Sequence, residues 1–164
     1  MIDMVKRVNG IFWAVVDVVK PMAPLLTRLV IGYAFVQTGI GKWQNFHDVV
    51  EFFTSLGLPA PAANAAFIAS LEVVGGAALI LGIGTNLFAA LLSSTIIVAL
   101  LTADRADLVS ALSGGDKSLT DVLPVIFLMP LTWLVGFGAG PLSLDYLLKK
   151  RLGTPVAAPT KVLA

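Results

Sequence analysis

Four long apolar stretches constrain what this chain of 164 residues can fold into. They cover residues 21–41, 62–83, 86–102 and 119–137, and helices of about these lengths cross roughly 30 Å of hydrocarbon. Hydrophobic residues make up 57% of the chain and charged residues only 13%, which is too apolar for a soluble domain of this size. The sequence therefore predicts an all-α integral membrane four-helix bundle within residues 21–152.

The segments around these stretches have simpler patterns. Residues 1–20 place valines and a phenylalanine at helical spacing, which predicts an amphipathic helix lying on the membrane surface. The segment 46–56 predicts a short interfacial helix, and the polar segment 103–118 predicts an exterior loop. Residues 153–164, which include two prolines, are expected to form a disordered tail.

A short cytoplasmic helix is expected at residues 143–152, followed by that tail. Ser143 is well placed as its N-cap, Asp145 lies in its first turn, and Lys149, Lys150 and Arg151 lie at its C-terminal end. The alternative for Ser143 and Asp145 is that they face a partner protein.

Basic residues outside the apolar stretches predict the orientation. Seven lie on one side of the predicted membrane and three on the other, so the positive-inside rule places both termini in the cytoplasm. We expect the location to be a bacterial cytoplasmic (inner) membrane. The seven are Lys6, Arg7, Lys20, Lys149, Lys150, Arg151 and Lys161, and the three are Lys42, Arg105 and Lys117.

The composition excludes several kinds of chemistry within the chain itself. It contains no cysteine, so thiol exchange and thiolate-held iron–sulfur clusters are excluded. A single histidine, His47, excludes bis-histidine haem ligation and histidine-rich metal sites. The formal net charge of +1 provides no field for nucleic acid, so no nucleic-acid partner is expected.

Two charged residues inside the apolar stretches are the main candidates for a functional site. Arg28 shares one face of its predicted helix with two glycines, and Glu72 shares a face of the next helix with Gly75 and Gly76. Packing of these two faces predicts a direct or water-bridged ion pair between Arg28 and Glu72. Such a pair either fixes the helix register or binds a polar headgroup or a proton.

Three further residues complete the candidate site. Lys42 and Trp43 close the first apolar stretch, where they either line a ligand entrance or act as interfacial anchors. His47 either carries a proton or binds a headgroup, or it is simply solvated at the interface. We expect no covalently bound cofactor, and the predicted pocket would hold a quinone or a phospholipid.

Three segments carry a resemblance to a known family: RLVIGYAFVQTGIGKW (28–43), LEVVGGAALILGIGT (71–85) and GAGPLSLD (138–145). In this order they resemble the DoxX family of small four-helix membrane proteins, from about residue 23 to residue 148. Pro141 departs from the family pattern, which often has arginine there, so an anion-binding role for that arginine does not carry over. The resemblance implies an association with quinone-linked redox membranes, as in archaeal thiosulfate:quinone oxidoreductase.

The favoured hypothesis is a small non-catalytic membrane subunit of a redox or respiratory complex. It would stabilise that assembly or shape a quinone or lipid pocket, with the bilayer and other membrane subunits as its partners. One alternative is an oligomeric proton-coupled carrier of small solutes with Glu72 as the titrating group. Another is a quinone-reducing enzyme, for which the sequence shows no electron-donor site.

Overall fold

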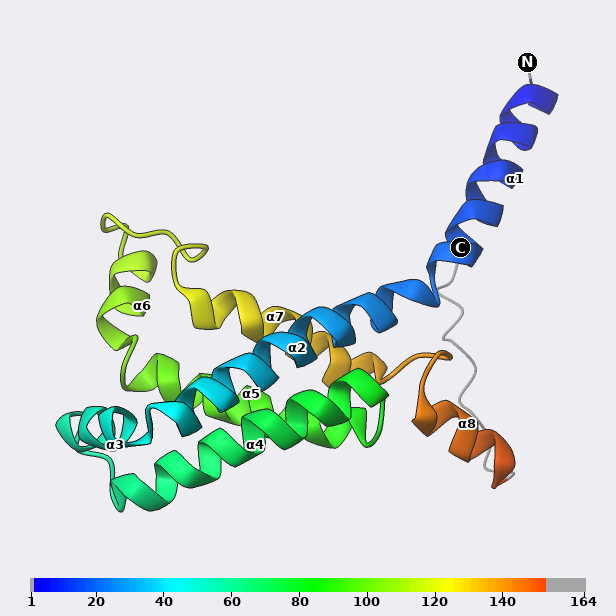
Figure 1. The fold of residues 1–164 in the computed structure, drawn as a ribbon. Coiled ribbons are helices and arrows are strands. Elements are labelled where there is room, and N and C mark those ends of the chain that lie inside the picture. The colour runs from blue at the N-terminus through cyan, green and yellow to red at the C-terminus, as the bar shows by residue number, and fades with distance from the viewer. Residues whose placement is uncertain (1, 153–164) are drawn as a thin grey trace.

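The computed structural model describes residues 2–152, whose regular elements are all helices (Figure 1). The predicted tail at 153–164 lies outside the described residues. The helices are α1 (Ile2–Val19), α2 (Met22–Gln44), α3 (Phe46–Ser55), α4 (Pro61–Leu81), α5 (Thr85–Leu101), α6 (Arg105–Leu112), α7 (Leu123–Phe137) and α8 (Leu144–Arg151).

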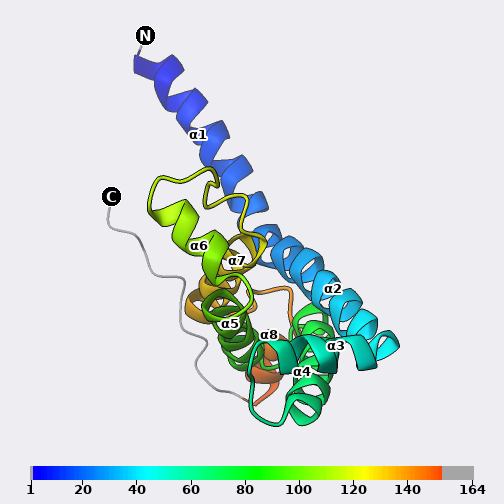
Figure 2. The same cartoon turned by 90° about the vertical axis from the view of Figure 1, so that its left-hand side faces the viewer.

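Four long helices, α2, α4, α5 and α7, are arranged as two helical hairpins. Helix α2 packs mainly on α4, and α5 packs mainly on α7, while contacts between α4 and α5 and between α2 and α7 join the hairpins. Each hairpin has a short helix at its bend, α3 in the first and α6 in the second. Figures 1 and 2 show α3 and α6 at one end of the molecule, with α1 and α8 extending from the other.

Glycines bring α2 and α4 into close contact, as their shared helix faces predicted. A Cβ atom on Gly32 would lie 2.6 Å from the carbonyl oxygen of Gly76, and one on Gly39 would lie 2.8 Å from that of Ala69. Both positions are too close for any larger side chain without movement of a backbone. The small residues therefore set the distance and the register between the two helices.

The interior of the four packed helices is mostly apolar. Its fully buried side chains include Leu79 of α4, Leu92 of α5, and Leu131 and Leu134 of α7. Phe35 of α2 packs on this cluster and meets Phe127 edge to face, with ring centroids 5.7 Å apart. The core thus draws side chains from all four helices and holds the two hairpins together.

The outer surface of the helices is also apolar. Large hydrophobic side chains with more than half of their surface exposed occur on several helices, among them Val30, Phe67, Leu87 and Met129. By length and hydropathy, α4 is long and apolar enough to cross a membrane, and α5 with α6 passes as a pair bent by 80°. Helix α7 is a shorter apolar helix.

Two segments differ from the sequence prediction. The segment 103–118 was predicted as a loop, but it contains α6, which follows a break after α5 at Thr102 to Asp104. Helix α7 begins at Leu123 instead of residue 119, because Asp121 accepts a hydrogen bond from the backbone N–H of Ser118 and closes a turn. Local side-chain hydrogen bonds of this kind compete with the helix.

Candidate functional site

The buried glutamate forms an ion pair with a lysine near the end of α2. Lys42 Nζ lies 2.6 Å from Glu72 Oε2, with 26% of the lysine side chain and 8% of the glutamate side chain exposed. Side chains on a helix lean toward its N-terminus. Because α2 and α4 are antiparallel, Lys42 leans toward the middle of the bundle and Glu72 leans toward Lys42.

The predicted ion pair between Arg28 and Glu72 is wrong, and the helix register gives the reason. Gly32 lies against Gly76, so Glu72 is opposite Val36, eight residues from Arg28. At about 1.5 Å per residue this offset is about 12 Å along the helix axis. The same N-terminal lean that joins Lys42 to Glu72 moves the Arg28 side chain away from it.

Arg28 instead connects backbone segments at the opposite end of the bundle. Its side chain is fully buried, and its Nη2 donates a 2.6 Å hydrogen bond to the carbonyl oxygen of Leu142 in the α7–α8 connection. Its Nε donates to the carbonyl oxygen of Pro24 at 3.3 Å. The guanidinium group packs against Gly82, which ends α4 with φ of 70° and leaves no room for a Cβ atom.

Asp145 connects the same end of the bundle to the start of α5. Its carboxylate accepts hydrogen bonds from the backbone N–H groups of Gly84 at 2.8 Å and Thr85 at 3.1 Å. Its own N–H donates to the carbonyl oxygen of Gly82. The predicted N-cap of α8 is confirmed, since Ser143 Oγ accepts from the N–H of Tyr146. Arg28 and Asp145 therefore fix the connections at this end.

The Lys42–Glu72 pair lies in the wall of a cavity of about 410 Å³ at the α3 end of the bundle, here called the Lys42–Glu72 cavity. This volume falls within the range of roughly 300–1,000 Å³ typical of small-molecule sites. Most of the lining is apolar and comes from α2, α3, α4, α5 and α7. The large apolar side chains that line it are Phe35, Phe52, Phe53, Leu56, Leu58, Ile68, Ile96, Leu123 and Phe127.

The other polar groups of the cavity are three threonines and an aspartate. The hydroxyls of Thr38, Thr95 and Thr102 all donate to carbonyl oxygens of their own helices, so toward the cavity they can act as acceptors. Asp104 lies at the break between α5 and α6, and among the described side chains its carboxylate makes no ion pair. The charged side chains that line the cavity therefore carry no net positive charge.

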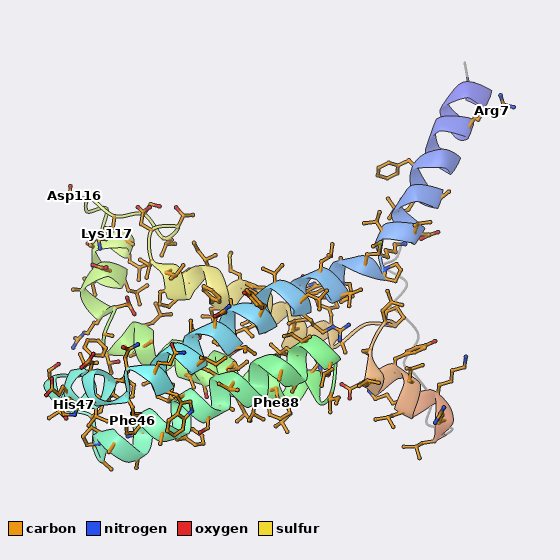
Figure 3. All side chains as sticks on the ribbon, in the orientation of Figure 1. Arg7, Phe46, His47, Phe88, Asp116 and Lys117 are labelled. Carbon is orange, nitrogen blue, oxygen red and sulfur yellow. The ribbon has the colours of Figure 1, made fainter. Side chains whose placement is uncertain are left out.

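Trp43 and His47, the other predicted site residues, lie outside this cavity. Trp43 stacks on Phe46, with ring centroids 5.2 Å apart, and faces a shallow groove on the outer side of α2 and α4. The His47 side chain is 84% exposed and lies 3.1 Å from Glu51 on α3, at the edge of the molecule in Figure 3. Lys42 and Glu72 are thus the predicted site residues that the fold brings together.

Sequence reasoning missed two contributions to the cavity. The aromatic pair Phe52 and Phe53 closes it from α3, and Asp104 reaches it because α5 ends at a sharp break. The apolar spacing of α3 was visible in the sequence, but the neighbour on which it packs was not. The break at Thr102 has no proline or glycine to mark it.

The arrangement suits recognition of a neutral, mostly apolar molecule by a few hydrogen bonds. Lys42 has two N–H groups beyond the one that it donates to Glu72, and Glu72 Oε1 remains available as an acceptor. A carbonyl oxygen could accept from Lys42 while a hydroxyl donates to Glu72. No group of three or more metal-binding side chains occurs among the described residues.

Comparison with known proteins places these features in a family. The DoxX family profile matches residues 23–105, slightly more than half of the chain. A protein of Bacillus subtilis (strain 168) named "Putative oxidoreductase CatD" is 35% identical over 78 residues, which are 48% of this chain and 57% of that protein. The chain thus covers little more than half the length of this relative. No solved structure matches this chain. The match over α2, α3, α4 and α5 shows that the chain belongs to the DoxX family.

Proposed function

We propose that α2, α4, α5 and α7 cross a membrane as a four-helix bundle. The family and the apolar helix α4 suggest a membrane protein. The apolar outer surface of the four helices is the surface that lipid would cover. Helices α1 and α8 then lie on the cytoplasmic side of a bacterial inner membrane, and α3 and α6 lie on the outer side. The distribution of basic residues supports this orientation.

Within that membrane the protein acts as a small non-catalytic subunit of a redox complex. The single observation that carries this proposal is the partly buried Lys42–Glu72 pair in the wall of an apolar cavity. An ion pair needed only for register would pack against apolar groups, whereas this one borders a space of about 410 Å³. The oxidoreductase name of the Bacillus subtilis relative supports a redox context.

The ligand that best fits the Lys42–Glu72 cavity is a quinone headgroup. A quinone is flat and neutral, its carbonyl oxygens can accept from Lys42, and the aromatic side chains of Phe52, Phe53 and Phe127 can contact its ring. A headgroup with a net negative charge fits poorly, because Glu72 neutralises Lys42 and Asp104 adds a further carboxylate. A zwitterionic phospholipid is the competing ligand.

Binding of a short-chain quinone to the purified protein tests the ligand assignment. Ala99 lines the cavity on α5, so Ala99→Phe fills part of it and should abolish saturable binding measured by calorimetry. Ala90 is exposed on the same helix outside the cavity, and Ala90→Phe is the matched control. Equal binding by both variants would refute the cavity as the site. Mass spectrometry of solvent extracts distinguishes quinone from phospholipid.

The subunit role has a separate test. Gentle extraction of the native membrane should recover the protein together with other membrane subunits that contain a redox centre. Recovery of the protein alone, from membranes in which it is expressed at its natural level, would refute this role. Proton-driven solute uptake in proteoliposomes that is lost in Glu72→Gln would favour the carrier alternative.

A further inference from the structure

Helix α8 presents an apolar face that no part of the described chain covers. Leu144, Leu147, Leu148 and Leu152 are between 40% and 77% exposed. At 100° per residue, Leu147 and Leu148 lie within about 60° of Leu144 on the helix surface. A soluble helix of this size normally packs such a face against a neighbour.

The charges of α8 are arranged around that face. Lys149 and Lys150 fall about 120–140° from Leu144 on the two sides of the polar surface. Arg151 falls near the middle of the leucine face, at the end of the helix, where its long stem can follow the apolar surface while its charge remains in water. Two basic residues thus flank the exposed leucines, and a third lies at the C-terminal end of their row.

The one acidic residue of α8 does not offset these charges at the surface. The Asp145 carboxylate points back into the bundle and accepts hydrogen bonds from Gly84 and Thr85. These bonds and the hydrogen bond from Arg28 to Leu142 also hold the start of α8 in a fixed position. Helix α8 is therefore presented in one orientation at the end of the bundle from which α1 also extends (Figure 1).

We infer that α8 is a docking surface for an anionic lipid leaflet. The leucine face enters the region between headgroups and acyl chains, and Lys149, Lys150 and Arg151 bind anionic headgroups. Charge complementarity selects this occupant, since an apolar protein partner would not require three adjacent basic residues. The inference rests on the proposed membrane embedding, which places this end of the bundle at one leaflet.

Spin labels in lipid nanodiscs test this inference. The chain has no cysteine, so Leu148→Cys gives one labelling site on the leucine face of α8. Access of the label to a water-soluble nickel chelate is measured in phosphatidylcholine discs and in discs that also contain phosphatidylglycerol. The expected result is a severalfold loss of access when the anionic lipid is present. Added salt should reverse it.

Two further variants separate the possible outcomes. Replacing Lys149, Lys150 and Arg151 by Gln in the Leu148→Cys background should make access independent of lipid charge. Val30→Cys, exposed on α2, reports whether the bundle itself lies in lipid. A label at Val30 accessible to the chelate in both discs would refute the membrane embedding.

The inference on α8 can fail while the membrane embedding holds. If the label at Val30 is protected but the label at Leu148 is equally accessible in both discs, the inference on α8 is overturned. Equal protection in both discs, retained after removal of the three charges, would also overturn it, because a protein surface or a purely apolar contact would then cover α8.

Discussion

The glycine contact between α2 and α4 can be tested with two alanine substitutions on one helix. In Gly32→Ala, the new methyl group would lie 2.6 Å from the carbonyl oxygen of Gly76 and 2.8 Å from Cγ1 of Ile80. In Gly41→Ala, on the same helix, the methyl group would meet nothing within 4 Å. The two variants make the same chemical change and differ in what the methyl group contacts.

The expected magnitude follows from these distances. Ordinary contact begins at 3.4 Å, so Gly32→Ala requires the helices to separate locally by about 0.8 Å. Overpacking of this kind costs about 1–3 kcal/mol. Since the atom opposite is a backbone oxygen that cannot rotate away, we expect the upper half of that range. Gly41→Ala should instead gain up to about 1 kcal/mol from helix propensity.

Unfolding by sodium dodecyl sulfate from mixed micelles, followed by circular dichroism, measures both variants under the same conditions. We expect the free energy of unfolding of Gly32→Ala to fall below that of Gly41→Ala by at least about 2 kcal/mol. Equal stability of the two variants would refute the proposal that close packing of glycines sets the helix spacing.

Three other predictions concern single interactions. Lys42→Met should reduce the free energy of unfolding by about 1–3 kcal/mol. This is less than the roughly 3–5 kcal/mol lost when a fully buried pair is broken, because Lys42 is partly exposed. In a double-mutant cycle, adding Glu72→Gln should recover much of the loss. Asp145→Asn should cost about 1 kcal/mol and increase hydrogen exchange at the Gly84 amide, and unchanged exchange would contradict the capping role. Ala60 has a left-handed φ of 44°, so Ala60→Gly should increase the free energy of unfolding slightly, by about 0.5–1 kcal/mol, and a decrease would contradict a strained backbone at this position.

The sequence predicted much of the fold because apolar length and small-residue spacing are local signals. Helices α2, α4 and α5 begin and end within three residues of the predicted apolar stretches. The shared face of Gly32 and Gly39 predicted the close contact with α4, which is confirmed. The N-cap at Ser143 is confirmed for the same reason, since capping depends on residues a few positions apart.

The pairing of charges could not be predicted from such signals alone. Arg28, Lys42 and Glu72 all lie on the packed faces, and helical angles do not distinguish which cation meets Glu72. The answer depends on the axial register of α2 against α4 and on the lean of each side chain toward its helix N-terminus. When the axial register and the side-chain lean are both included, Lys42 is the residue that pairs with Glu72, and Arg28 donates hydrogen bonds to backbone carbonyl oxygens.

The two ends of the bundle consequently differ in how their polar groups are satisfied. Arg28 donates from Nη2 and Nε to the carbonyl oxygens of Leu142 and Pro24 and is enclosed by the chain, although its Nη1 has no hydrogen-bond partner among the described residues. Lys42 and Glu72 instead border a cavity that a ligand could enter. Sites that share no partner contribute additively to stability, within about 0.5 kcal/mol. Arg28→Gln and Glu72→Gln should therefore add in the double variant, while only the change at Glu72 should weaken binding of a short-chain quinone to folded protein. Strong coupling between the two substitutions would mean that the ends communicate through the packed helices, and Arg28 would then belong to the site after all.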